Sequence, residues 1–181
     1  VANDIGFAQD ACAPFERPGH YNAPDMLVVG IVGWGAGKQH PSKLTADEQY
    51  THITLWSMLS APLLLGCDLM RLDPFTLSLL TNDEVIAIDQ DPLVKQAVSV
   101  ARDGPGDIYR KELADGSIAV ALFNRGAAPA TVTARWADLK LTGSQKVRDV
   151  WREKDMGVAA NSMSASVNPH GVVLYRLTPV K

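Results

Sequence analysis

Asn22 and Asp25 are the side chains of this sequence whose position most suggests chemistry. They stand in the stretch "GHYNAPDMLVVG", residues 19–30, directly before the apolar run Met26–Val29. A carboxylate at the entrance of a buried strand is either a structural tie or part of a site. As a tie, Asp25 would accept backbone N–H bonds within its own turn, as Asx side chains often do. Met26, taken alone, is typical of a core residue, because an unbranched thioether fills gaps well.

Histidine and cysteine residues do not combine into a predicted metal site. None of the four histidines forms a pair with metal-ligand spacing. Cys12 and Cys67 fit none of the close spacings of zinc sites, and two cysteines are too few for a disulfide framework. We expect both thiols to be free, no metal and no cofactor. Cys67 has no basic neighbour in sequence that would lower its pKa, so it is typical of a small buried residue rather than a nucleophile.

The glycine-rich stretch "GWGAG", residues 33–37, contains the indole of Trp34. It lacks the GxGxxG spacing and has no helix directly after it, which argues against a phosphate cradle. Trp34 has two interpretations. Its indole either stacks on a sugar ring at an open site or seals the loop against the fold.

Residues 1–93 alternate apolar strand patterns with helical patterns. The run at 25–30 is short and continuously apolar, as in a strand covered on both faces. Thr45 and Glu48 form a predicted capping box for a helix that Pro62 ends.

A second strand is predicted over "PLLLGCDLM", residues 62–70, ending at Asp68. Asp73 and Asn82 are then predicted N-caps of two further short helices. This alternation of strands with helices predicts a parallel sheet.

Such a sheet is incomplete by itself. A (β/α)8 barrel needs eight strand-and-helix units and at least about 200 residues, and only two units fit here. Two parallel strands with apolar faces leave edges that seek partners. We therefore expect residues 1–93 to be the C-terminal part of a (β/α)8 TIM barrel, and the chain to be the end of something longer.

Residues 94–181 show short alternating segments instead. Asp115 and Gly116 lie between two of them and predict a tight hairpin. Spacings of roughly 8 to 12 residues indicate an antiparallel β-sandwich, here of Greek-key type. The predicted strands are "DIYRKEL", "SIAVALFN", "ATVTARW", "QKVRDVW", "SMSASV" and "GVVLYRL".

Composition excludes several functional classes. A net charge of −3, with 17 Lys and Arg residues scattered along the chain, argues against nucleic-acid binding. No apolar run is long enough to span a bilayer, and the first ten residues lack a signal-peptide pattern. The compartment stays open.

Three long motifs carry a resemblance to a known family. They are "PGHYNAPDMLVVG", "LTADEQYTHITLWSMLSAPLLLGCDLMRLD" and "LLTNDEVIAIDQDPL". In this order they resemble the last two barrel units of the melibiases, the α-galactosidases and α-N-acetylgalactosaminidases of glycoside hydrolase family 27. "DGSIAVALFNR", "VRDVW" and "GVVLYRLTP" resemble that family's C-terminal antiparallel domain more loosely.

The resemblance implies a retaining glycosidase that acts on α-galactosides or related oligosaccharides. Its nucleophile and acid/base aspartates would lie upstream of Val1, in the N-terminal barrel portion, so this chain alone is expected to be inactive. Asp25 and Met26 match the family's "PDM" at the end of the seventh strand, where they would border the sugar pocket, and Trp34 is the third candidate contact. Ala23 stands where the family usually has Asp.

Asp68 invites pairing with Asp25 as the two carboxylates of a retaining glycosidase, roughly 5 Å apart. We reject that pairing, because the family places its two acids elsewhere. Asp68 is expected to hold a loop or a helix start. Neither sugar specificity nor linkage follows from the sequence.

Two alternatives remain at this level. The β domain would be a non-catalytic carbohydrate-binding or structural module if Tyr109, Trp136 and Trp151 formed an exposed row. In a small sandwich such aromatic residues are mostly core. The chain would otherwise be a folded remnant with no separate role.

Overall fold

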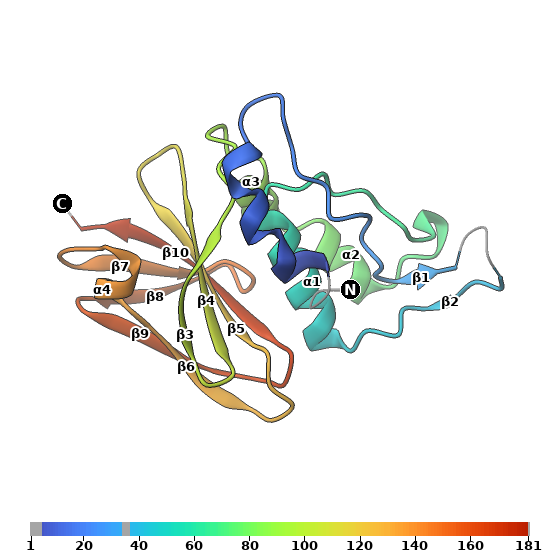
Figure 1. Cartoon of the computed structure of the whole chain (residues 1–181). Coiled ribbons are helices and arrows are strands. Elements are labelled where there is room, and N and C mark those ends of the chain that lie inside the picture. Colours follow the sequence, from blue (N-terminus) through green and yellow to red (C-terminus); the bar gives the residue numbers. More distant parts are fainter. Residues whose placement is uncertain (1–4, 34–36, 181) are drawn as a thin grey trace.

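The computed structural model describes residues 5–33 and 37–180. A layer of short helices packs against one face of an antiparallel sheet, and a two-stranded ribbon covers the other face (Figure 1). The first layer contains η2 (Phe7–Phe15), β1 (Ile31–Val32), β2 (His40–Pro41), α1 (Ala46–Met58), η3 (Leu69–Arg71), α2 (Pro74–Leu80) and α3 (Asp83–Asp89).

The predicted helix caps are confirmed. Thr45 Oγ1 accepts from the Glu48 amide at 3.2 Å, and the Glu48 carboxylate accepts from the Thr45 amide at 2.8 Å. Asp73 and Asn82 likewise cap α2 and α3. These local bonds satisfy amides that no helical carbonyl reaches, which fixes where each helix begins.

The end of α1 differs from the prediction. The helix stops at Met58, before Pro62 is reached. Ser60 adopts a left-handed φ of 49°, and the Ala61 amide donates back to the Trp56 carbonyl at 3.0 Å. This Schellman-type turn ends the helix before the proline.

The two predicted buried strands of the first layer do not form as regular strands. Leu27 and Leu65 make a single parallel bridge, in which the Leu27 amide donates to the Leu64 carbonyl at 2.7 Å. The parallel direction agrees with the prediction, but Leu64 and Leu65 are 56% and 43% exposed rather than buried. The Asp68 amide also donates to the Ile31 carbonyl, and on the other side of the first segment the Ser42 amide donates to the Gly30 carbonyl, but these bonds are too sparse for a regular ladder. Barrel membership stays a prediction.

The second layer is an antiparallel sandwich. Six strands pair in the order β3-β4-β5-β10-β7-β8, and β6 pairs with β9. The hairpin predicted at Asp115 and Gly116 joins β4 to β5. The elements are β3 (Val98–Asp103), β4 (Gly106–Glu112), β5 (Ile118–Asn124), β6 (Ala130–Arg135), α4 (Trp136–Leu139), β7 (Gln145–Asp149), β8 (Lys154–Ala159), β9 (Ser162–Val167) and β10 (Val172–Pro179).

Alternation along β4 and β5 builds two cores. Tyr109 and Phe123 face α1, whereas Ile108 and Leu122 face the β6–β9 ribbon. The first core therefore contains residues from both sides of residue 93. The division at 93/94 stays a prediction, and it falls between the end of α3 at Asp89 and the start of β3 at Val98.

No helix in the described part of the chain is long and apolar enough to cross a bilayer. Within the same residues, no three His, Cys, Asp or Glu side chains gather as a metal site would require.

Candidate functional site

Asp25 is exposed and held in an unusual backbone conformation. Its φ is +82°, which costs a non-glycine residue about 1–2 kcal/mol. Its Oδ1 accepts from the Met26 amide at 2.7 Å, which is the tie within its own turn that the sequence suggested. Its exposure leaves the carboxylate accessible, so the tie does not replace a role in binding.

Helix α1 holds the backbone that carries Asp25. The Trp56 indole Nε1 donates to the Asp25 carbonyl at 2.6 Å, and the Val28 amide donates to His52 Nε2 at 3.0 Å. The Ser42 hydroxyl donates to the Val28 carbonyl at 2.6 Å. Sequence analysis found neither contact of α1, although His52 and Trp56 are four residues apart and so share one helix face.

Met26 is 46% exposed, so the core interpretation that its residue type favoured is wrong. It lies over Gly66, where an added Cβ would come within 2.6 Å of the Met26 sulfur. Asp25 and Met26 were expected at the end of a strand. In the structure the paired stretch includes Leu27, which follows them in the chain, so the stretch does not end at these two residues.

Trp34 lies outside the described residues, and its predicted sugar contact stays a prediction. The loop that contains it leaves β1 and returns through β2, which pair as Ile31 with Pro41 and Val32 with His40.

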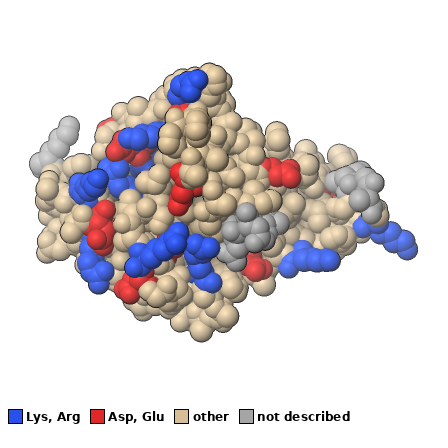
Figure 2. Space-filling view, in the orientation of Figure 1, with Lys and Arg blue, Asp and Glu red and all other residues tan. Residues whose placement is uncertain are grey.

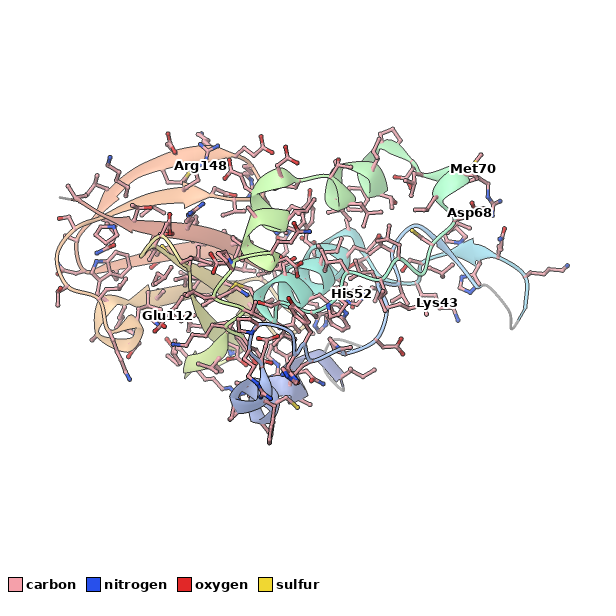
Figure 3. The ribbon with its side chains drawn as sticks, turned by 90° about the horizontal axis from the view of Figure 1, so that it is seen from above. Lys43, His52, Asp68, Met70, Glu112 and Arg148 are labelled. Atoms are coloured by element: carbon pink, nitrogen blue, oxygen red, sulfur yellow. The ribbon has the colours of Figure 1, made fainter. Side chains whose placement is uncertain are left out.

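Asp68 has the structural role that was expected. It caps η3, accepting from the Met70 amide at 3.0 Å and from Arg71 Nε at 2.7 Å. The Arg71 hydrogen bond lowers the pKa of the Asp68 carboxyl below its usual range. Asp68 and Met70 lie near the end of the first layer that is far from the sandwich, whereas His52 lies in its interior (Figure 3).

The expected free cysteines are confirmed. Cys67 is buried, and burial raises the pKa of its thiol, which disfavours the nucleophilic thiolate. This supports its role as a small buried residue.

The aromatic residues of the sandwich do not form an exposed row. Tyr109 is buried against Phe7 and Phe123, and Trp136 is buried in the core on the opposite face of the sheet. Trp151 donates to Thr54 Oγ1 at 2.7 Å and packs edge-on against Tyr50. Tyr109 and Trp151 therefore join the sheet to the helical layer, which contradicts the feature on which a carbohydrate-binding module rested.

A cluster of charges that sequence analysis missed lies where the two layers meet. Lys111 of β4 is fully buried and donates to Ser60 Oγ and to the Ser57 carbonyl, at the C-terminal end of α1. Burial lowers the pKa of Lys111 to about 8 and raises those of Glu16 and Asp89 to about 7. Both carboxyls have buried oxygens without a hydrogen-bond partner in the described structure.

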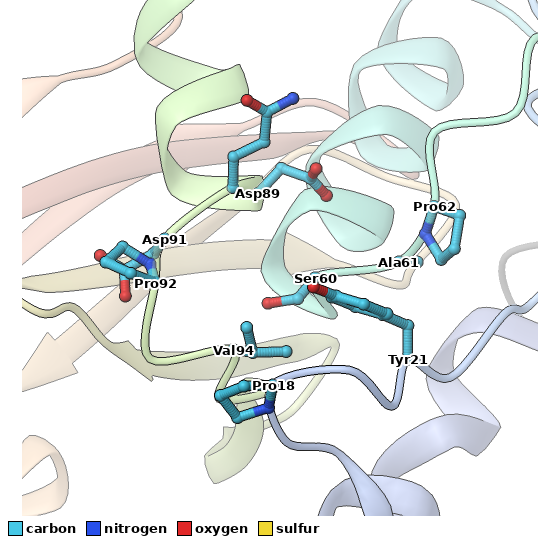
Figure 4. Close-up of a pocket in the computed structure, with 10 residues that line it drawn as sticks. Pro18, Tyr21, Ser60, Ala61, Pro62, Asp89, Asp91, Pro92 and Val94 are labelled. Carbon is cyan, nitrogen blue, oxygen red and sulfur yellow. The ribbon is translucent and has the colours of Figure 1, made fainter.

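Ser60 and Asp89 line a pocket of about 500 Å³ beside this cluster, together with Tyr21 (Figure 4). Of the three charged groups, Asp89 is the one that lines the pocket. On the face shown in Figure 2, acidic and basic side chains are interspersed over the sandwich.

Comparison with known proteins identifies the family. A family model described as Alpha galactosidase A matches residues 2–91, and a model of the Alpha galactosidase C-terminal beta sandwich domain matches residues 103–177. Alpha-galactosidase 2 of Arabidopsis thaliana is 40% identical over 176 residues. The chain belongs to the α-galactosidase family that these two models describe, glycoside hydrolase family 27.

Solved structures of family 27 have the same arrangement. A β-L-arabinopyranosidase from Geobacillus stearothermophilus superposes with a TM-score of 0.86 at 31% identity, over 97% of this chain and 40% of that one. A variant of the same enzyme was solved in complex with arabinose. Alpha-galactosidase I from Mortierella vinacea superposes with a TM-score of 0.82 at 31% identity, over 93% of this chain and 42% of that one.

The match covers nearly all of this chain but less than half of its first relative. It covers 96% of this chain but only 42% of the Arabidopsis enzyme. The chain thus spans about two fifths of the length of the relatives it matches.

Proposed function

We propose that this chain is the C-terminal part of an α-galactosidase that removes terminal α-galactosyl units. Residues 1–93 would supply the last two units of a (β/α)8 barrel and one wall of its sugar pocket. The succession of the two family matches, residues 2–91 followed by 103–177, is the observation that carries this proposal.

The proposed reaction is a double displacement with retention. One aspartate attacks the anomeric carbon as the glycosidic bond breaks, and a second carboxyl protonates the departing oxygen. The second carboxylate then takes a proton from water, whose oxygen attacks the anomeric carbon and releases the nucleophile. We assign neither aspartate to the 181 residues, so this chain alone is expected to be inactive.

Asp25 and Met26 are the proposed substrate contacts. The Asp25 carboxylate would accept hydrogen bonds from sugar hydroxyls, which are strong when the acceptor is charged. The Met26 thioether would pack against the apolar face of the sugar ring. Exposure of both side chains supports this role, and Trp34 remains the proposed stacking residue.

A chimera tests this function. In it, this chain replaces the matched 176 residues of the Arabidopsis enzyme. We expect the chimera to hydrolyse an aryl α-galactoside, and the isolated chain to leave it intact. An aryl β-L-arabinopyranoside serves as the competing substrate. A folded chimera that leaves the α-galactoside intact, whether or not it cleaves the arabinopyranoside, or turnover by the isolated chain, would overturn the proposal.

A further inference from the structure

Two buried rings on α1 hydrogen-bond to the backbone of residues 25–28 rather than to side chains. His52 is 1% exposed and Trp56 is fully buried. The rings lie one helical turn apart and pack edge-on, with centroids 4.2 Å apart. Their polar atoms reach two peptide groups of one irregular segment.

That segment has unequal support from the rest of the backbone. The amide and carbonyl of Leu27 bond to the neighbouring segment, at the Leu64 carbonyl and the Gly66 amide. The Val28 amide instead donates to His52, and the Asp25 carbonyl accepts from Trp56. Side chains of α1 therefore satisfy groups that an adjacent strand satisfies in a sheet, as buried backbone groups require.

The Trp56 bond acts on the strained residue itself. Asp25 has its carbonyl fixed by the indole, while its carboxylate accepts from the next amide. Strained conformations persist only where the surroundings determine them. Without the indole bond, the peptide after Asp25 would be held only through its amide, by the Asp25 carboxylate, and the directions of the Asp25 and Met26 side chains would be less restricted.

The His52 bond requires one protonation state. Because Nε2 accepts from the Val28 amide, the ring proton must be on Nδ1. Burial lowers the pKa of His52 to about 4, so the ring is neutral at ordinary working pH. Nδ1 is buried and has no hydrogen-bond partner in the described structure, so the ring is held through Nε2 and its packing.

We propose that His52 and Trp56 are positioning residues that fix the direction in which Asp25 and Met26 face the sugar. This inference rests on the proposed function, since it assigns these two residues to the sugar pocket. Neither ring touches substrate in this account. They act through the backbone of the segment.

The chimera described above provides the kinetic test. Trp56→Phe keeps the aromatic ring and removes the N–H donor. Loss of one such hydrogen bond corresponds to about a tenfold change in binding. We expect KM for the aryl α-galactoside to rise by about that factor while kcat changes less. His52→Leu should raise KM similarly, and His52→Gln, which keeps an acceptor, should restore it.

Trp151→Phe is the matched control. This variant likewise removes an indole N–H donor, whose acceptor is the Thr54 hydroxyl on the same helix. The Trp151 indole donates to neither Asp25 nor Val28. Its KM should match that of the parent. Equal KM values in the Trp56→Phe and Trp151→Phe variants would overturn the positioning role. Failure of the proposed function would instead appear as an inert chimera with His52 and Trp56 intact.

Amide hydrogen exchange on the isolated chain gives an independent readout. His52→Leu should speed exchange at Val28, and Trp56→Phe should speed exchange at Met26, whose amide is held by the Asp25 carboxylate. Unchanged protection at both amides would overturn the inference without reference to catalysis.

Discussion

The two layers of the molecule differ in how completely they bury their apolar residues. All seven residues of β5 are buried, because the β4 and β10 neighbours pair on both edges and packing covers both faces. In the first layer, Leu64, Leu65 and Met26 are exposed around the isolated Leu27–Leu65 bridge. The sheet is therefore covered on both faces within this chain, by α1 and by the β6–β9 ribbon, whereas the helical layer leaves apolar side chains exposed of the kind that a larger barrel would cover.

The largest expected effect lies in the sandwich. Phe123→Ala should cost about 3–5 kcal/mol, because it removes a buried ring packed against Phe7 and Tyr109. Chemical denaturation of the isolated chain measures this. A loss below about 1 kcal/mol would show that the shared core is looser than described.

The exposed edge should behave in the opposite way. Leu64→Asp in the isolated chain should change stability by less than about 0.5 kcal/mol, because Leu64 is already more than half exposed. In the chimera the same change should cost at least about 2 kcal/mol, because it buries a charge against the rest of the barrel. Equal effects in the two proteins would contradict the proposed burial of this edge.

The charged cluster between the layers predicts a pH dependence. Glu16 and Asp89 have raised pKa values of about 7, so the folded state retains protons that the unfolded state releases above about pH 4. Stability should fall as pH rises from about 4 to 7, by about 1–2 kcal/mol after allowance for solvent screening. Above about pH 8 the folded state loses the Lys111 proton, whereas the unfolded state keeps it. The contribution of this group to stability therefore rises with pH in that range.

Thermal unfolding across this pH range measures the effect. The double variant Glu16→Gln with Asp89→Asn should flatten the fall between pH 4 and 7. Glu153→Gln, on an exposed turn, is the control and should leave the slope unchanged. If the double variant kept the slope of the parent, these two carboxyls would not be the cause of the pH dependence.

The smallest expected effect is at the start of α1. Thr45→Ala removes half of the capping box and should cost about 1 kcal/mol. Thr131→Ala, on an exposed position of β6, serves as the comparison. Equal losses in the two variants would mean that the cap adds nothing beyond the general cost of removing a threonine.

Local chemistry explains which elements could be predicted from sequence. Thr45, Asp73 and Asn82 act within three residues of themselves, so their caps follow from spacing. Strand β8 was missed because most of its residues are exposed and show no alternation. Its place in the sheet depends on pairing with β7, which spacing does not encode.

The site was harder to predict, because its contacts join distant parts of the chain. Asp25 was visible as a candidate, but the indole that holds it comes 31 residues later. Lys111 has the sequence features of a surface lysine, but it is buried with its ammonium group bonded to the Ser60 hydroxyl, 51 residues away in the chain. Only the packing of the sheet on α1 brings such groups together.

Galactose binding to the chimera shows whether the Asp25 carboxylate contacts the sugar. Calorimetry would compare Asp25→Asn with Asp68→Asn, since both change a carboxylate to an amide but only Asp25 is assigned to the pocket. We predict that Asp25→Asn weakens binding by about tenfold or more, as loss of a charged hydrogen bond does, and that Asp68→Asn leaves it unchanged. Unchanged affinity in the Asp25 variant, or equal loss in both, would exclude Asp25 as a specific sugar contact.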